Sequence, residues 1–452
     1  MNRTEEPRLG YGFGVADLYR REGLLRLDQI FLAELGAAAP SLHQELVQAR
    51  NQPGSLTRSA SSDLAIRIAP KLEIFVAKLF GVDAELHLLQ QRHADLAPLF
   101  RIKREFVQRQ AAKKIKPQDA TQFDGQALFD KLQRLLGAPF SERLFASAVS
   151  EWLLDEAAHE QELAVAQQYA AWAVHTAGGQ QRHHDGLLFK IPGSVDPMNL
   201  VRPAQWCNED GTSRLRIQPD HLRRREGFGL TDAGFDLSRA LDQAHYCIQC
   251  HPQKKDSCSD GLKERPSKDA PQTLVYKKSP FGVTLSGCPL EERISEFHLL
   301  KSQGCPIGAL AVIVLDNPMV AGTGHRICND CMKACIYQKQ DAVNIPQVET
   351  RTLKDVLELP FGFEIYSLLT RWNPLNFARP YPRAATGRKV LVVGLGPAGY
   401  TLAHHLLNDG HTVVGIDGLK IEPLPEALSG VRLDGSRTRF GALRDVQSIA
   451  EP

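Results

Sequence analysis

Apolar residues recur every three or four positions through the first half of the chain, which is the spacing of amphipathic helices. Residues 71–80 and 150–175 show this pattern most clearly, with few alternations of the kind that strands produce. We therefore expect a mainly α-helical region up to about residue 235. The residues predicted to form the apolar faces are Leu72, Phe75, Val76 and Leu79 in the first segment, and Leu154, Ala158, Val165, Tyr169 and Trp172 in the second.

The pattern changes after this region and suggests how the chain is divided. Residues 183–229 are rich in Gly, Pro, Asp and Arg, which predicts a long surface connection. We expect a helical domain at 1–235, which we assign to partner docking, and a helical domain rich in cysteine at 236–370. A linker rich in Pro and Arg at 371–387 then leads to the first part of a nucleotide-binding fold at 388–452.

Composition narrows the class of protein. The 452 residues are 43% hydrophobic and carry a net charge of only +2, so no overall field favours nucleic acid or an anionic membrane. The basic run at 101–116 is typical of a solvated face or a protein-docking patch. No secretory signal and no apolar run long enough for a membrane span are present, which favours the cytoplasm.

Eight of the nine cysteines lie between residues 247 and 335, and two groups have C-x2-C spacing. In a chain without a secretory signal, this spacing favours metal binding over disulfides. Soft thiolates on short loops are the ligands of 4Fe-4S clusters, and a proline often follows one of them, as at Cys288 and Cys305. Two zinc sites are the alternative, because C-x2-C is also a zinc signature.

A glycine fingerprint follows the cysteine region. Residues 389–393 read as a strand, residues 402–407 as the apolar face of a helix and residues 411–416 as a second strand. Glycines at this turn allow a tight bend and a close approach to a pyrophosphate at the helix N-terminus. Asp417 stands where an acidic side chain accepts from ribose hydroxyls. The predicted dinucleotide-binding residues are Gly394, Gly396, Pro397, Ala398, Gly399 and Asp417.

The order of these motifs resembles the small subunit of glutamate synthase and the N-terminal region of dihydropyrimidine dehydrogenase, iron-sulfur flavoproteins of the pyridine nucleotide-disulfide oxidoreductase type. The resemblance covers residues 237 to about 420. It implies a helical, ferredoxin-type domain with two 4Fe-4S clusters, followed by an FAD domain of Rossmann type and an NADPH domain. The segments that carry it are Cys288-Pro-Leu, Ile294-Ser-Glu-Phe, Asn317-Pro, Gly324-His-Arg-Ile-Cys328, Cys331, Lys333-Ala-Cys335, Val343-Asn-Ile and Lys389-Val-Leu-Val-Val-Gly-Leu-Gly-Pro-Ala-Gly399.

Carried over by position, the resemblance implies two ligand sets. The first is Cys247, Cys250, Cys258 and Cys335, and the second is Cys288, Cys328 and Cys331 with Glu349 as the fourth ligand. Cys305 is a rival fourth ligand, although the family has no cysteine at that position. As alternatives to these roles, Glu349 is an ordinary exposed charge and Cys305 a buried apolar residue. Cys207 is expected to be structural.

The chain departs from the family in two ways. Between Cys258 and Cys288 lie 29 residues, including Lys263, Arg265, Lys268, Lys277 and Lys278, where the family has only a few. Such an insertion can loop out at small entropic cost, either as a docking surface or as a solvated loop. Only 53 residues follow Gly399, without a second fingerprint, so we expect a fragment of a longer enzyme or one part of a split enzyme.

Together these features predict an oxidoreductase module. It would relay electrons through two 4Fe-4S clusters between FAD and another redox subunit, with NAD(P)H reducing the flavin only when the missing part or a partner is present. One alternative is a non-enzymatic electron-transfer adaptor that carries clusters without stable flavin. Another is a zinc-stabilised interaction scaffold. The sequence identifies no catalytic residue.

Overall fold

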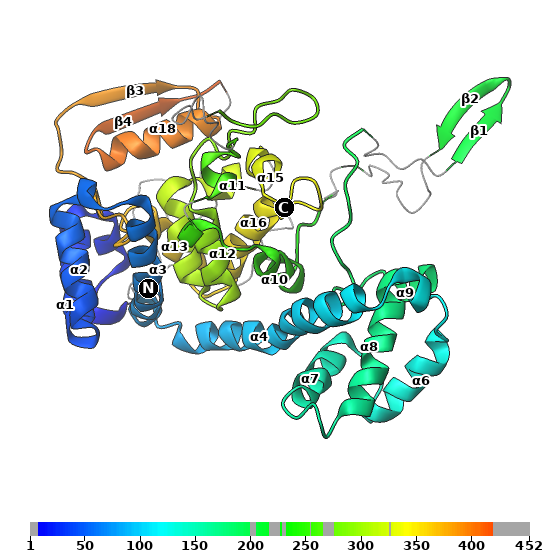
Figure 1. The fold of residues 1–452 in the computed structure, drawn as a ribbon. Coiled ribbons are helices and arrows are strands. Elements are labelled where there is room, and N and C mark those ends of the chain that lie inside the picture. Colours follow the sequence, from blue (N-terminus) through cyan, green and yellow to red (C-terminus); the bar gives the residue numbers. More distant parts are fainter. Residues whose placement is uncertain are drawn as a thin grey trace, which may run out of the picture.

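The computed structural model describes residues 8–198, 205–216, 227, 232–253, 255–264, 275–324 and 327–418, and this part of the chain is mainly helical (Figure 1). Its only strands are the pairs β1–β2 and β3–β4. The mainly α character predicted for the chain is confirmed. No helix within these ranges combines the length and the apolar character needed to cross a bilayer.

Three N-terminal helices form the first unit: α1 (Arg21–Ala38), α2 (Pro40–Asn51) and α3 (Arg58–Phe80). The Thr57 side chain caps the start of α3, and Gly81 ends it with a φ of +62°, a conformation that favours glycine. The helix predicted at 71–80 lies within α3. Its four expected core residues, Leu72, Phe75, Val76 and Leu79, are all buried, which confirms that prediction.

A second helical unit follows. Helix α4 (Asp83–Ile102) continues without a break into a π-helix, Lys103–Ala112. Then come α5 (Pro117–Ala120), α6 (Gly125–Leu136), α7 (Glu142–Trp152), α8 (Glu160–His175) and α9 (Ala177–Arg182). The single helix expected over 150–175 is wrong, because α7 ends at Trp152 and α8 begins at Glu160. Leu154, expected in the core, lies in this break and is 85% exposed.

The connection predicted at 183–229 contains a hairpin that the sequence reasoning missed. Strand β1 (Gln205–Glu209) pairs antiparallel with β2 (Thr212–Arg216), and the hairpin stands apart from the helices in Figure 1. Asp210 and Gly211 form its turn, both with positive φ. An Asp-Gly pair favours such two-residue turns, so the signal was present in the sequence.

The cysteine region is built from short helices. These are α10 (Leu237–Tyr246), α11 (Ser257–Asp260), α12 (Ile294–Ser302), α13 (Pro306–Asp316), α14 (Val320–Thr323), α15 (Asp330–Ala334), α16 (Ile345–Leu357) and α17 (Gly362–Leu369). Helix α13 is almost entirely buried and packs on α3, α12 and α16. It forms the centre of this region.

The buried side chains form two hydrophobic cores. The first core joins the N-terminal helices to the cysteine region, and Trp372 from beyond α17 packs against both Phe31 and Phe75 within it. The second core is formed by side chains from residues 99–189. Leu237 and Leu241 of α10 complete it. The N-terminal helices thus share a core with residues beyond 235. The domain boundary that the sequence predicted at residue 235 stays a prediction.

The last described unit is a β-α-β arrangement. Strand β3 (Lys389–Val393) pairs in parallel with β4 (Thr412–Ile416), and α18 (Pro397–Asn408) connects them and packs on both. These elements lie where the sequence predicted them. Residues 419–452 lie outside the described part, so the fold expected for them stays a prediction.

Candidate functional site: two cysteine groups and a glycine turn

Four cysteines from two distant segments lie around one cavity. Cys247 ends α10 and Cys258 lies in α11, whereas Cys335 directly follows α15. Helices α11 and α15 pack together, which brings Cys335 to the other segment. The cavity is lined by these three cysteines and Cys250, together with apolar residues that include Ile294, Val343 and Ile345. These are the four residues of the first predicted ligand set.

The surroundings of this first cysteine group are apolar and tightly packed. Burial raises the pKa of Cys247 to about 12 and that of Cys250 to about 11. The Cys258 thiol donates a hydrogen bond to Cys335, which raises the pKa of Cys258 and lowers that of Cys335. Thiols that are this close and this well desolvated suit a shared metal centre, which stabilises the thiolate form.

One further side chain lines the same cavity and was missed by the sequence reasoning. His298 on α12 is fully buried, and neither of its ring nitrogens has a hydrogen-bond partner in the described structure. Burial lowers its pKa to about 3, so the ring is neutral. A buried unpartnered imidazole is costly unless something nearby accepts from its N–H. No spacing motif in the sequence pointed to it.

The second cysteine group lies around Cys331, and Cys328 is its exposed member. Cys331 on α15 lies close enough to Cys288, Cys328 and Glu349 for their charges to raise its pKa, although burial is the largest cause. Burial also raises the pKa of Cys288, to about 11. The structure therefore brings all four residues of the second predicted set into one neighbourhood.

Glu349 is itself buried, with 6% of its surface exposed, so it is no ordinary surface charge. The Asn317 side chain donates to it at 2.8 Å. A second buried carboxyl, Glu292, also bonds to Glu349, and burial raises the pKa of both acids. Glu292 was not predicted. Its place four residues after Cys288 is the only signal that the sequence offered.

The two ends of the insertion between Cys258 and Cys288 are joined by hydrogen bonds. The backbone N–H of Cys288 donates to the carbonyl of Cys258 at 2.8 Å and to that of Ser259 at 3.1 Å. Isolated bridges such as Lys263 to Tyr276 close the loop on itself. The insertion therefore leaves Cys258 beside the second group. Arg265 and Lys268, which the sequence placed in a docking surface or a solvated loop, lie outside the described residues.

The remaining cysteines lie elsewhere. Cys305 is buried at the start of α13, where it bonds to Glu73 of α3 within the first core. Cys207 lies on β1, and its side chain is outside the described part. Among the residues that the structure describes, no group of three or more His, Cys, Asp or Glu surrounds a single point as the ligands of one metal ion do.

The glycine fingerprint forms an open turn in front of a helix N-terminus. Gly394 has a φ of +91°, and a Cβ on Gly399 would collide with the carbonyl of Gly394. At Gly396 a Cβ would meet no atom within 4 Å, which leaves open space in front of the N-terminus of α18. Pro397 and Ala398 form the first turn of that helix, and no side chain caps it. This cradle fits a diphosphate group.

Asp417 at the end of β4 faces the same turn. Its carboxylate accepts from the backbone N–H of Leu395 at 2.6 Å. On the surrounding strands, large apolar side chains remain exposed, among them Leu391 at 59% and Val393 at 75%. The described β-α-β unit therefore leaves apolar surface uncovered.

Comparison with known proteins gives relatives in two groups. Residues 9–81, which contain α1 to α3, match the family model for the RP005 N-terminal alpha-helical domain. The chain is 33% identical to the uncharacterized protein RP005 of Rickettsia prowazekii over 291 residues, 62% of this chain and 94% of RP005. It is 64% identical to the uncharacterized protein RP006 of the same organism over 106 residues, 24% of this chain and 15% of RP006.

The second group is more distant. The chain is 31% identical to the glutamate synthase (NADPH) small chain of Mycobacterium tuberculosis over 183 residues, 37% of this chain and 34% of that relative. It thus spans about a third of that protein and a smaller share of RP006. Part of the chain is therefore distantly related to an oxidoreductase subunit, which supports the resemblance at the level of the family.

Proposed function

The chain belongs to the family of the Rickettsia protein RP005, and we propose that it is an iron-sulfur flavoprotein module that relays electrons between FAD and a partner redox subunit. One 4Fe-4S cluster would be held by Cys247, Cys250, Cys258 and Cys335. The other would be held by Cys288, Cys328, Cys331 and Glu349. Such clusters supply one-electron transfer.

The convergence of the first cysteine group on one cavity carries this proposal. Cys335 is far from the other three in sequence, and only the packing of α15 on α11 brings it to them. A structural role for buried thiols would not require four of them to face the same small space. The apolar lining from Ile294 and Ile345 keeps water from this space, and burial is one of the factors that set the potential of a cluster.

For the second group, the chemistry of its side chains, three thiols and one buried carboxyl, supports their proposed role as cluster ligands. Glu349 is buried beside Cys331, where a carboxyl could complete a set of three thiolates. Cys305 faces Glu73 instead, which favours Glu349 as the fourth ligand. The Asn317 amide, which donates to Glu349, would hold its carboxylate in place.

The fingerprint is assigned to FAD. The open space at Gly396 and the uncapped N-terminus of α18 would bind the diphosphate, and Asp417 would accept from a ribose hydroxyl. Exposed Leu391 and Val393 favour one second candidate, an electron-transfer adaptor that keeps its clusters but holds no stable flavin. In either case, NAD(P)H would act through a partner.

The test is anaerobic purification followed by quantitation of iron, sulfide, zinc and flavin in the same sample. The proposal predicts about eight iron and eight sulfide per chain and bound FAD. Clusters without flavin would support the adaptor instead. Stoichiometric zinc without sulfide would overturn both and leave a structural metal protein.

A further inference from the structure

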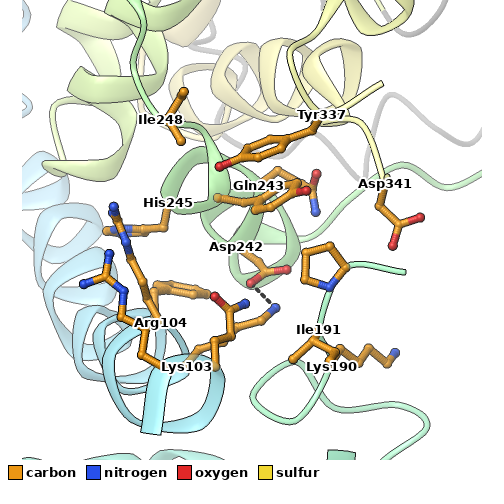
Figure 2. A pocket seen from close by; sticks show the side chains of 15 residues that line it. Lys103, Arg104, Lys190, Ile191, Asp242, Gln243, His245, Ile248, Tyr337 and Asp341 are labelled. Atoms are coloured by element: carbon orange, nitrogen blue, oxygen red, sulfur yellow. Dashed lines mark hydrogen bonds and ion pairs between the residues drawn. The ribbon is translucent and has the colours of Figure 1, made fainter. Parts of the chain in front are cut away.

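A separate pocket lies between the second helical unit and the cysteine region. Its walls come from the π-helix, from α10, from residues 190–192 and from the segment after α15, as Figure 2 shows. Its volume is about 360 Å³. Pockets for small molecules occupy about 300–1,000 Å³, so this one falls at the lower end of that range.

The walls of the pocket carry an excess of positive charge. Lys103 is neutralised by Asp242 at 2.5 Å, and both side chains are nearly buried. Arg104, Arg109 and Lys190 also line the pocket, and none of them forms an ion pair within the described part of the chain. The other carboxylate on the wall, Asp341, accepts from the backbone N–H of Gly193 at 3.0 Å. Four cations therefore face two carboxylates in this lining, and the net positive charge favours an anionic group.

The pocket also has an aromatic wall. Tyr246 and Tyr337 stack with their ring centroids 4.6 Å apart and their planes 12° from parallel. Phe100 and His245 form a second stacked pair, at 4.9 Å and 18°. Such faces bind planar rings by stacking, and guanidinium groups strengthen that contact. In Figure 2, Arg104 and Ile191 lie on opposite sides of the pocket.

One polar atom on this wall has no partner. The hydroxyl of Tyr246 is buried and makes no hydrogen bond in the described structure. A buried hydroxyl without a partner is unfavourable, and a ligand that offers it an acceptor would be stabilised by that contact. The π-helix that presents Lys103, Arg104 and Arg109 is a second unusual feature, because π-helical turns are rare and are frequent at functional sites.

We propose that this pocket binds a phosphorylated compound with a planar ring, of the mononucleotide class. Arg104, Arg109 and Lys190 bind the phosphate, the aromatic wall contacts the ring, and the Tyr246 hydroxyl donates to the ligand. Arg104 and Arg109 come from the second helical unit, whereas Tyr246 and Tyr337 come from the cysteine region, so the site exists only when these units are packed together. This site is distinct from the glycine turn and adjoins the cavity of the first cysteine group, with which it shares Ile248 and Tyr337.

The experiment is isothermal titration of the full chain, purified with its bound cofactors, with three probes: AMP, adenosine and ribose 5-phosphate. We expect saturable binding of AMP and at least tenfold weaker binding of the other two, since each lacks one of the two recognised groups. Equal binding of all three probes, or no saturable binding of AMP, would overturn the proposal.

Substitutions of residues that line the pocket test whether AMP binds there. The double variant Arg104→Gln with Arg109→Gln should weaken AMP binding at least tenfold, and Tyr246→Phe should weaken it without changing the fold, because only the hydroxyl is lost. Lys113→Gln with Lys114→Gln is the matched control, since these exposed lysines follow the same π-helix outside the pocket.

A second control separates the pocket from the glycine turn. Gly396→Asp places a carboxylate in the phosphate cradle, where its Cβ meets no other atom, and should leave AMP binding unchanged. If Gly396→Asp abolishes AMP binding while the double arginine variant retains it, the ligand binds at the turn and the pocket assignment is wrong.

Discussion

Cys258 and Cys305 show how much the surroundings of a residue matter. Both are buried free thiols, with 8% and 6% of their surface exposed. Cys258 lies in the cavity with three other cysteines, whereas Cys305 bonds to Glu73 at the start of α13. The proline that follows Cys305 made it a rival ligand in the sequence, but its position in the first core favours a structural role.

Replacing these two cysteines should therefore give different results. Cys258→Ser should lower the iron content by about four per chain, because the first group loses one of its thiolates. Cys305→Ser is the control and should leave iron unchanged. The measurement is iron and sulfide per chain after anaerobic purification. Equal loss in both variants would contradict the ligand assignment.

His298 should affect the first group without binding metal. We expect His298→Leu to keep the full iron content but to lower the reduction potential of the first cluster. The reason is that an N–H directed at the cluster stabilises the added electron. The measurement is a potentiometric titration followed by electron paramagnetic resonance.

The control for this prediction is His93→Leu. His93 is also buried with an unpartnered ring nitrogen, but it lies near Asp355 and does not line the cysteine cavity. Its replacement should leave the potential unchanged. An unchanged potential in His298→Leu would show that its ring makes no contact that matters for the cluster.

At the scale of elements, α3 and α13 are joined by an unusual helix cap. Helix α13 has no side-chain cap of its own at Cys305. Instead, the Glu73 carboxylate on α3 accepts from the N–H of Ile307 at 2.7 Å and from that of Gly308 at 3.2 Å. A negative charge at a helix N-terminus is favourable, so this contact ties the N-terminal unit to the cysteine region.

Glu73 should also make stability depend on pH. Burial raises its pKa from 4.5 to about 6, so the folded chain binds its proton at a higher pH than the unfolded chain does. Its contribution to stability therefore increases as the pH falls from 6 toward 4.5, by about 2 kcal/mol at 1.36 kcal/mol per pKa unit.

The measurement is the unfolding temperature of the native chain and of Glu73→Gln at pH 7, 6 and 5. Relative to the variant, the native chain should gain stability as the pH falls. Glu105→Gln, which changes an exposed carboxyl on the π-helix, is the control and should show no such trend. A constant difference across this pH range would contradict the raised pKa.

The β-α-β unit contrasts with the helical elements. Its strands and helix follow from local signals, since apolar runs, a glycine with positive φ and a close helix contact at Gly399 are all encoded within 28 residues, 389–416. The break between α7 and α8 has no such local signal. Leu154 and Ala158 fit a helix face by spacing, yet the chain turns there to pack α8 into the second core.

At the scale of the whole molecule, α10 links the two cores. Leu237 and Leu241 of α10 contribute to the second core, and Ala244 contributes to the first. The buried pair of Lys103 and Asp242 lies at the same junction, with 11% and 13% of the side chains exposed. Figure 1 shows the second unit extending from the rest along α4, so this junction controls how the units are held together.

Breaking this pair should loosen the junction. Asp242→Ala leaves Lys103 as an unpaired buried cation, at a cost of about 3–5 kcal/mol. We expect faster hydrogen exchange in the π-helix and in α10, with α1 to α3 still protected. Asp95→Ala, which removes an exposed ion pair to Arg143, is the control and should change little. Uniform exchange across the molecule would instead indicate global destabilisation.

The sequence by itself determined the features that depend on residues close together along the chain. The helix containing Leu72 and Phe75, the glycine turn at Gly394 and the presence of metal-type cysteine spacing all follow from local pattern and backbone freedom. The two ligand sets came from the resemblance to a family, and the order of motifs was sufficient to suggest them.

Only the tertiary structure decided which groups face one another. Cys335 joins Cys258 because α15 packs on α11, and Glu349 is buried because α16 packs on α13. The pocket beside Tyr246 and the cavity position of His298 depend in the same way on elements far apart in the chain. Spacing along a chain specifies contacts within a few residues, whereas the burial of apolar surface across distant helices selects which polar groups share a cavity.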